Sequence, residues 1–352
     1  MSQLIRTCPD CDEPSRREFL RVVGSGAAAA AIVGAAPGLL LAEEKKDAKT
    51  PETLVKQLYD SLNERQRKEV CFDWDYQDPV HGLLRTRISN NWHITKPVLY
   101  SEYYTGNQQE MVRAIWEGII QPDWQKRVDK QLLDDAGGFG KQQNFAIFGK
   151  PGDGKFELVM TGRHMTLRCD GNSTDSVAFG GPIFYGHAAS GFDEKPGHPG
   201  NVYWEQALSA NKVYEMLDGK QRKLSEVPEL PKEQAVGFQG EKGKFPGIAV
   251  ADLSTDQKEQ VQKTLQKLIE PYRQSDQDEV LACLKAQGGL DKCSLAFFTN
   301  PDLGDDRIWD SWRLEGPSFV WYFRGKPHVH VWVNVADTPD LELNSYQDSV
   351  GV

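Results

Sequence analysis

The chain has few cysteines for its length and no excess of basic residues. It contains 6 cysteines in 352 residues, too few for the dense disulfide framework that holds many small secreted domains together. Lys and Arg number 41 against 51 Asp and Glu, which gives a formal net charge of −10. This acidic balance argues against nucleic acid and anionic membrane surfaces as partners.

Several common catalytic motifs are also missing. There is no GxSxG elbow, which disfavours a hydrolase of that type, and no helix-borne HExxH zinc motif. The Gly-rich and Pro-rich stretch 170–200 contains neither GxGxxG nor GxxxxGK, so it does not read as a phosphate-binding loop. Asp and Glu occur all along the chain, so no carboxylate pair for glycoside cleavage can be assigned.

The first residues carry a targeting signal. Residues 15–21 read SRREFLR, a twin-arginine export motif, and a weakly hydrophobic Ala/Gly-rich run follows at 22–42. Gly and Pro interrupt that run and no long apolar stretch follows it, which disfavours a transmembrane anchor. We therefore expect a signal peptide at 1–42 and a charged linker at 43–50. Passage through the twin-arginine export machinery would leave a periplasmic or extracellular protein without membrane insertion.

Two of the six cysteines, Cys8 and Cys11, lie in the segment expected to be removed. Four remain in the mature chain: Cys71, Cys169, Cys283 and Cys293. An oxidising compartment permits disulfides, and Cys283 and Cys293 are the nearest pair in sequence. Buried free thiols are the equally weighted alternative, because four cysteines in a domain of this size do not form a framework.

The apolar periodicity predicts a mixture of helices and antiparallel strands. Helices are predicted at 50–69, 108–120, 124–133, 202–217, 254–272 and 278–286. Strands are predicted at 145–148, 294–298, 318–323 and 328–335, with 156–169 either one long strand or a hairpin. Without a regular βαβ alternation the class is α+β, a single large domain over 51–352 with a mixed, mainly antiparallel sheet and several surrounding helices. No internal repeat is predicted, and residues 221–247 are expected to form an exposed connection.

The region 309–336 has the densest aromatic and β-branched content. Its two apolar runs flank the polar connection 324–327, which predicts a β-hairpin. Side chains alternate across a strand, so the second run has two distinct faces. One face carries valines at 329, 331, 333 and 335 and is expected to be the core face, and the other carries His328, His330, Trp332 and Asn334.

Two histidines two apart on a strand project in parallel and can give two ligands to one metal ion. A third ligand must then come from elsewhere, and His164 is the first candidate and His187 the second. Neutral imidazoles with an open position suit zinc, copper or iron. Glu315 is a candidate fourth ligand or general base.

Two further considerations bear on this metal site. Asp310 and Asn334 are candidates to orient the imidazoles. Twin-arginine passengers fold before export, often to receive a cofactor, which favours a metal. The alternative is that His328 and His330 are half-buried strand residues packed on Trp332.

Five motifs resemble an exported bacterial family catalogued as domain of unknown function 3500. They are LNERQR (62–67), GRHMTL (162–167), GGPIFYG (180–186), WRLEGP (312–317) and PHVHVW (327–332). The resemblance spans about 51–340 and implies one fold and export, but no activity. The family pattern pairs a Gly-His-His-Leu-type strand with a later His-x-His strand. This chain departs from the pattern at Arg163, where the first paired histidine would fall, and at Trp321-Tyr322, where the family tends to place an acidic residue.

The sequence thus leads to two functional hypotheses. The first is an exported metal-dependent enzyme of unassigned reaction, hydrolytic or oxidative. It requires His164 or His187 within about 4–5 Å of the His328/His330 pair. The alternative is a non-catalytic extracytoplasmic binding protein that holds a small molecule or a glycan, which requires exposed Trp side chains along a groove.

Overall fold

The computed structural model describes residues 50–171, 173–174, 176–188, 195, 198, 200–302, 305–341 and 344–345. The signal peptide predicted at 1–42, with Cys8 and Cys11, lies outside these residues, as does the linker up to residue 49. Within the described ranges, no helix is both long enough and apolar enough to cross a membrane.

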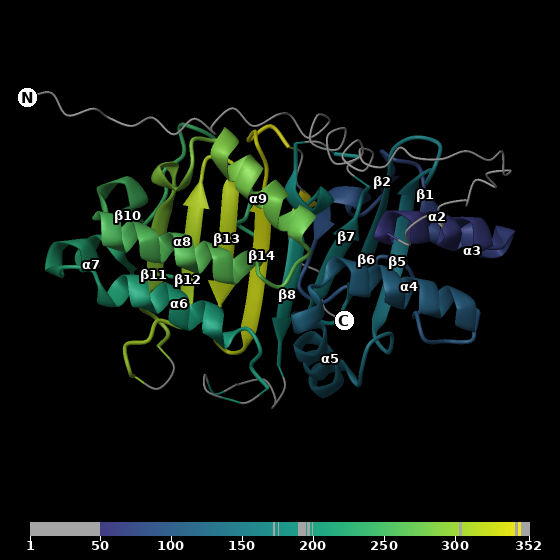
Figure 1. The fold of residues 1–352 in the computed structure, drawn as a ribbon, viewed down its shortest axis with the longest axis horizontal. Helices are drawn as coiled ribbons and strands as arrows, with labels where there is room; N and C mark the ends of the chain where they lie inside the picture. Colours follow the sequence, from purple (N-terminus) through teal and green to yellow (C-terminus); the bar gives the residue numbers. More distant parts are fainter. Residues whose placement is uncertain are drawn as a thin grey trace, which may run out of the picture. The chain divides into compact units, whose positions relative to one another are not determined.

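One large sheet organises the described chain (Figure 1). Ten strands follow in the order β1 (Cys71–Phe72), β5 (Gln143–Gly149), β6 (Phe156–Gly162), β7 (Met165–Cys169), β8 (Ile183–His187), β14 (Val329–Val335), β13 (Phe319–Arg324), β12 (Ser311–Gly316), β11 (Ser294–Phe298) and β10 (Ile248–Ala249). An eleventh, β9 (Glu226–Val227), also pairs with β11. Only the β1/β5 and β9/β11 pairs are parallel in this sheet. Two small sheets pair β2 (Gln77–Asp78) with β3 (Gly82–Leu83) and β15 (Asn344–Ser345) with β4 (Arg87–Ile88).

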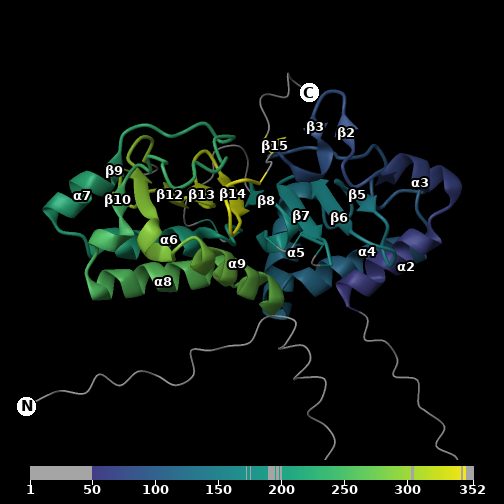
Figure 2. The same ribbon diagram turned by 90° about the horizontal axis from the view of Figure 1, so that it is seen from above.

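Helices cover one face of this sheet. They are α2 (Pro51–Ser61), α3 (Glu64–Val70), α4 (Gly106–Ile119), α5 (Pro122–Ala136), α6 (Trp204–Glu215), α7 (Gly219–Ser225), α8 (Thr255–Ile269) and α9 (Gln274–Ala286). Figure 2 shows α2, α4, α5, α6, α8 and α9 on one side and loops with the short strands β2, β3 and β15 on the other. The predicted α+β class with a mainly antiparallel sheet is therefore confirmed.

The predicted C-terminal hairpin is formed, and the stretch left open between one strand and a hairpin is also a hairpin. The strands β13 and β14 pair antiparallel, and the four valines of β14 lie in the main core under the helices. The stretch 156–169 is the hairpin β6–β7, with Arg163 and His164 as its two-residue turn. His164 has a φ of 51°, so it belongs to the turn and not to a strand.

The aromatic cluster of the C-terminal hairpin is buried. Its members are 0–8% exposed: Trp309, Trp312, Phe319, Trp321, Tyr322, Phe323 and Trp332. The exposed tryptophan groove required by the binding-protein hypothesis is therefore not formed by these residues. They pack the core instead, where a buried aromatic side chain stabilises the fold most.

The prediction of no internal repeat is wrong. The order α2, α3, β1, α4, α5, β5, β6, β7, β8 recurs as α6, α7, β9, α8, α9, β11, β12, β13, β14 among the described residues. The strand β10, the minor sheets and four short 3-10 helices lie outside the pattern. In both halves the short third element pairs in parallel with the first long strand, as β1 with β5 and β9 with β11. The last strands of the halves, β8 and β14, lie antiparallel at the centre of the sheet.

The sequences of the two halves also correspond. LNERQRK (62–68) matches LDGKQRK (217–223), TGNQQEMV (105–112) matches STDQKEQV (254–261), and GGFGK (137–141) matches GGLDK (288–292). Four helices in the matched segments begin with a capping box in which Gln is the third helical residue, position N3. They are α3, α7, α4 and α8. The identities are few and lie at caps, so hydrophobic periodicity does not reveal them.

The capping glutamines then pair between helices. Gln66 and Gln108 exchange two amide hydrogen bonds of 3.0 and 3.1 Å. Gln221 and Gln257 do the same at 3.0 and 2.8 Å. Each pair satisfies amide groups at a helix interface, and those of Gln66 and Gln108 are buried.

Residues 221–247 differ from the predicted exposed connection. They begin with part of α7 and with β9, and residues 228–246, here called the strap, cross the sheet face opposite the helices. Val236 is fully buried, Pro231 O accepts the Tyr322 hydroxyl at 3.2 Å, and Val236 O accepts Asn334 Nδ2 at 3.3 Å. The strap forms the cover that makes this second face a core.

The four cysteines of the described chain are free thiols, so the Cys283–Cys293 disulfide is not formed. Burial raises the pKa of Cys293 to about 12. The alternative of buried free thiols therefore describes three of the four, while Cys71 is only partly buried.

Candidate metal centre

Two of the three histidines lie on one row of residues that crosses β14, β8 and the turn before β7. His330 on β14 lies opposite Gly186 on β8. Met165 of β7 lies opposite Tyr185, so His164, one residue earlier, is level with Gly186. Side chains level on adjacent strands share a face, and Gly186 has none. The two imidazoles, from backbones roughly 9–10 Å apart, therefore meet over a glycine.

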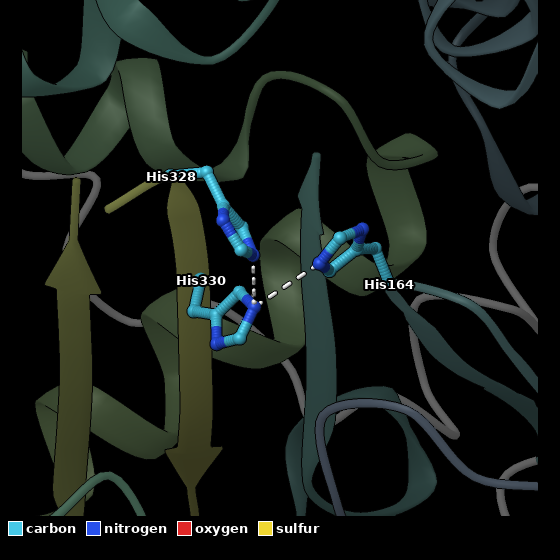
Figure 3. Close-up of side chains that lie close together, drawn as sticks. All are labelled: His164, His328 and His330. Carbon is cyan, nitrogen blue, oxygen red and sulfur yellow. Dashed lines mark hydrogen bonds between the residues drawn. The ribbon is translucent and has the colours of Figure 1, made fainter. Parts of the chain in front are cut away.

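Three histidines converge at this point (Figure 3). His164 Nε2 and His328 Nε2 each lie 3.0 Å from His330 Nε2. One nitrogen of each ring lies within 4.8 Å of the corresponding nitrogens of the other two. All three residues are buried, with exposures of 2–6%. Such a group of inward-facing imidazoles has the composition of a three-ligand metal site.

Two carboxylates fix the orientation of the rings. His164 Nδ1 donates to Asp135 Oδ2 at the end of α5. His330 Nδ1 donates to Glu233 Oε2 of the strap at 2.8 Å. A carboxylate acceptor holds the proton on Nδ1, so Nε2 of both rings keeps its lone pair. The carboxylate–histidine pairs therefore present bare nitrogens to one another.

Each carboxylate is in turn held by an arginine. Arg163 Nε lies 2.8 Å from Asp135 Oδ1, and Arg324 Nε lies 3.1 Å from Glu233 Oε1. Burial by itself would raise the pKa of Asp135, but its contacts with His164 and Arg163 outweigh burial and lower that pKa to about 2. The carboxylate thus stays ionised at neutral pH.

His330 is held in its neutral form. Burial lowers its pKa well below the usual range, and the positive charge of Arg324 adds to this effect. A neutral imidazole is the form that binds metal ions. Two lone pairs that face each other at 3.0 Å repel, and a cation between them removes the repulsion. Tetrahedral zinc–imidazole geometry separates such nitrogens by about 3.3 Å, close to the observed spacing.

The remaining predicted site residues lie elsewhere. His187 is level with Val329 on the neighbouring strand, so its side chain points to the helix-covered face, and burial lowers its pKa to about 4. Glu315 is level with Val320, which is level with Asn334. Its position is therefore two strands across and four residues along from His330. The Glu315 carboxylate is paired with Arg313 at 2.7 Å.

Of the two predicted orienting residues, Asn334 donates to Val236 O of the strap. For Asp310 the role stays a prediction, and its backbone O accepts Gly325 N at 2.9 Å. Asp135 and Glu233, which contact two of the imidazoles, were missed by sequence reasoning. Neither lies near a histidine in sequence, and only long-range packing brings them there. The last glycine of the GGPIFYG motif, Gly186, could have pointed to the site, because Gly within a strand often marks a place where another group approaches the backbone closely.

Neither a curated protein nor a solved structure matches the chain. One family does match, over residues 43–335, which is most of the sequence. That family is described only as a protein of unknown function, so it assigns no chemistry to the three histidines. The chain belongs to the DUF3500 family of proteins of unknown function.

Proposed function

We propose that the protein is a metal-dependent enzyme whose ion is held by Nε2 of His164, His328 and His330. The observation that carries the proposal is the convergence of these nitrogens at 3.0 Å while Asp135 and Glu233 occupy Nδ1 of two rings. Hydrogen bonding of the outer nitrogen to a carboxylate is the arrangement that orients metal-ligating histidines and raises their basicity.

Three neutral nitrogen ligands suit zinc, copper or iron. A fourth position remains for water or substrate, since the group contains only three side chains among the described residues. A bound ion of this kind polarises a ligand and lowers the pKa of water to about 7. The reaction class follows from the metal: hydrolytic with zinc, oxidative with copper or iron. With any of these metals, the three histidines would hold the ion in place.

We also propose that the protein acts outside the cytoplasm. The SRREFLR motif at 15–21 followed by the Ala/Gly-rich run supports export through the twin-arginine machinery. This route carries folded proteins, so the metal would be inserted before export. A signal-peptide variant, Arg16→Lys/Arg17→Lys, would then be retained in the cytoplasm, whereas correct export of this variant would contradict the proposal.

The metal content of natively exported protein tests the function. We expect about one equivalent of zinc, copper or iron in the wild type by elemental analysis, and loss of that metal in His328→Ala/His330→Ala. His93→Ala is the matched control, because His93 is exposed and lies outside the site. Absence of all three metals from folded wild type, or equal metal in the double variant, would contradict the proposal.

A further inference from the structure

A second site lies under the strap, away from the histidines. A pocket of about 500 Å³ opens between the strap and strands β11 and β12, within the range of about 300–1,000 Å³ usual for small-molecule sites. Its apolar lining includes Leu230, Pro231, Pro246 and Phe298. Its polar lining includes Arg313 and Glu315, which are 5% and 2% exposed.

The polar pair is only partly satisfied by the protein. Glu315 Oε1 accepts both Arg313 Nη2, at 2.7 Å, and Gln239 Nε2, at 2.9 Å. Arg313 Nε is buried and has no acceptor among the described residues. A buried donor without a partner costs free energy, and both Arg313 and Glu315 line the pocket. The pair thus offers guanidinium donors beside a carboxylate acceptor.

The charges around the pocket limit the class of ligand. An anion would approach Glu315 and also Glu229, which lines the pocket. A cation would approach the guanidinium of Arg313, which also lines the pocket. A hydroxyl group both donates and accepts and carries no charge, so neighbouring hydroxyls match the Arg–Glu pair. The apolar lining then contacts the carbon skeleton.

We propose that this pocket binds a neutral, polyhydroxylated small molecule, a sugar of one or two rings. Binding here does not require the metal ion, because none of the three histidines lines the pocket. The two sites share the strap, however. Pro231 and Ala235 line the pocket on either side of Glu233, the partner of His330. Occupation of the pocket would therefore steady the segment that orients one metal ligand.

Titration calorimetry with the metal-free mature protein tests this proposal. The probes are glucose, galactose, mannose, N-acetylglucosamine and their common disaccharides at millimolar concentrations. Glucuronate and glucosamine serve as charged analogues. We expect saturable binding of at least one neutral sugar and at least tenfold weaker binding of its charged analogues. No binding of any neutral sugar, or a preference for a charged analogue, would overturn the proposal.

Two variants locate the binding. Arg313→Met removes the donor and is expected to abolish binding, but it also leaves Glu315 without its cation. Leu230→Trp therefore serves as a second variant, since it fills the pocket and keeps the Arg–Glu pair intact. His164→Ala is the control that should retain sugar binding while losing metal. Wild-type sugar affinity in folded Leu230→Trp would place the ligand elsewhere and overturn the proposal.

Discussion

Each half of the chain has a two-residue hairpin turn at the same point of the repeat, and the two turns make different contacts. In the first half the turn follows Gly162 and contains His164. In the second it follows Gly316 and contains Ser318. His164 reaches Asp135 and the His330 ring. Ser318 instead donates its hydroxyl to Ala336 O at 2.8 Å, which fastens the turn to its own sheet.

The central strands differ in the same way. On β8 the residue beside the site is Gly186, which leaves space, while β14 supplies His330 and the residue just before β14 is His328. In the second half, Ser318 is instead level with Ala336, which donates its N–H to Ser318 O at 2.9 Å. The repeated fold therefore carries a single histidine site. The first half supplies the space at Gly186 and the turn with His164, and the second half supplies His328 and His330.

Replacing the two turn residues should give the largest contrast. We expect His164→Ala to lower metal affinity by more than about 100-fold, because loss of a ligand exceeds the 10–100-fold effect of an outer-shell partner. Ser318→Ala in the equivalent turn should leave metal content unchanged. Elemental analysis after dialysis measures both. Metal loss in the serine variant, or retention in the histidine variant, would remove the functional difference between the turns.

Filling the space at Gly186 should also disrupt the site. A Cβ at this position would meet Val329 O at 2.1 Å, so Gly186→Val must move the strand that carries His328 and His330. We expect loss of tight metal binding and about 1–3 kcal/mol less stability from overpacking. Gly106→Ala, where a Cβ meets nothing within 4 Å, is the control. Full metal content in folded Gly186→Val would show that the glycine is not required.

Replacing either carboxylate that orients a ring should weaken metal binding less than replacing a ligand does. Asp135→Asn in the first and Glu233→Gln in the second should each weaken metal binding about 10–100-fold while the three ligands remain. Competition with a chelator measures the affinities. Asp134→Asn and Glu241→Gln are matched controls, since neither residue contacts an imidazole. Unchanged affinity in both test variants would mean that the carboxylates do not orient the ligands.

The glutamine pairs test whether the halves are equally stable. Gln108→Leu should cost about 2 kcal/mol, because it removes the hydrogen bonds of the buried Gln108 side chain to Gln66, Ser61 O and Thr105 N. Gln257→Leu should cost less, about 1 kcal/mol, because Gln221 is only partly buried. Urea unfolding compares them, with exposed Gln266→Leu as the control. The reverse order would show that burial does not set the difference.

The last contrast is a pH dependence confined to the first half. The pKa of Asp135 is lowered to about 2 from 3.8 in the folded state, so its contribution is present above about pH 4 and is lost as the pH falls toward 2. We expect metal-free wild type to exceed Asp135→Asn by about 2 kcal/mol at pH 7. Urea midpoints should converge below pH 4, whereas a constant gap would exclude this titration.

Much of the fold follows from local pattern. Apolar periodicity gives the main helices, and strict alternation gives the hairpin with valines on one face and His328 and His330 on the other. These features depend on residues close in sequence, so one sequence by itself contains the information. Helix α7 and the strap were missed, because Lys, Glu and Pro there resemble an exposed connection although Val236 packs into a core.

Local sequence pattern likewise predicted one part of the site and not the other. The sequence determined that His328 and His330 project together, since side chains two apart on a strand share a face. Only the tertiary structure decided that His164 joins them across Gly186, while His187 on the adjacent strand faces the other side. Asp135 and Glu233, at 29 and 97 residues from their histidines, depend on the same folding. Strand neighbours and register are set by long-range pairing, which local alternation does not specify.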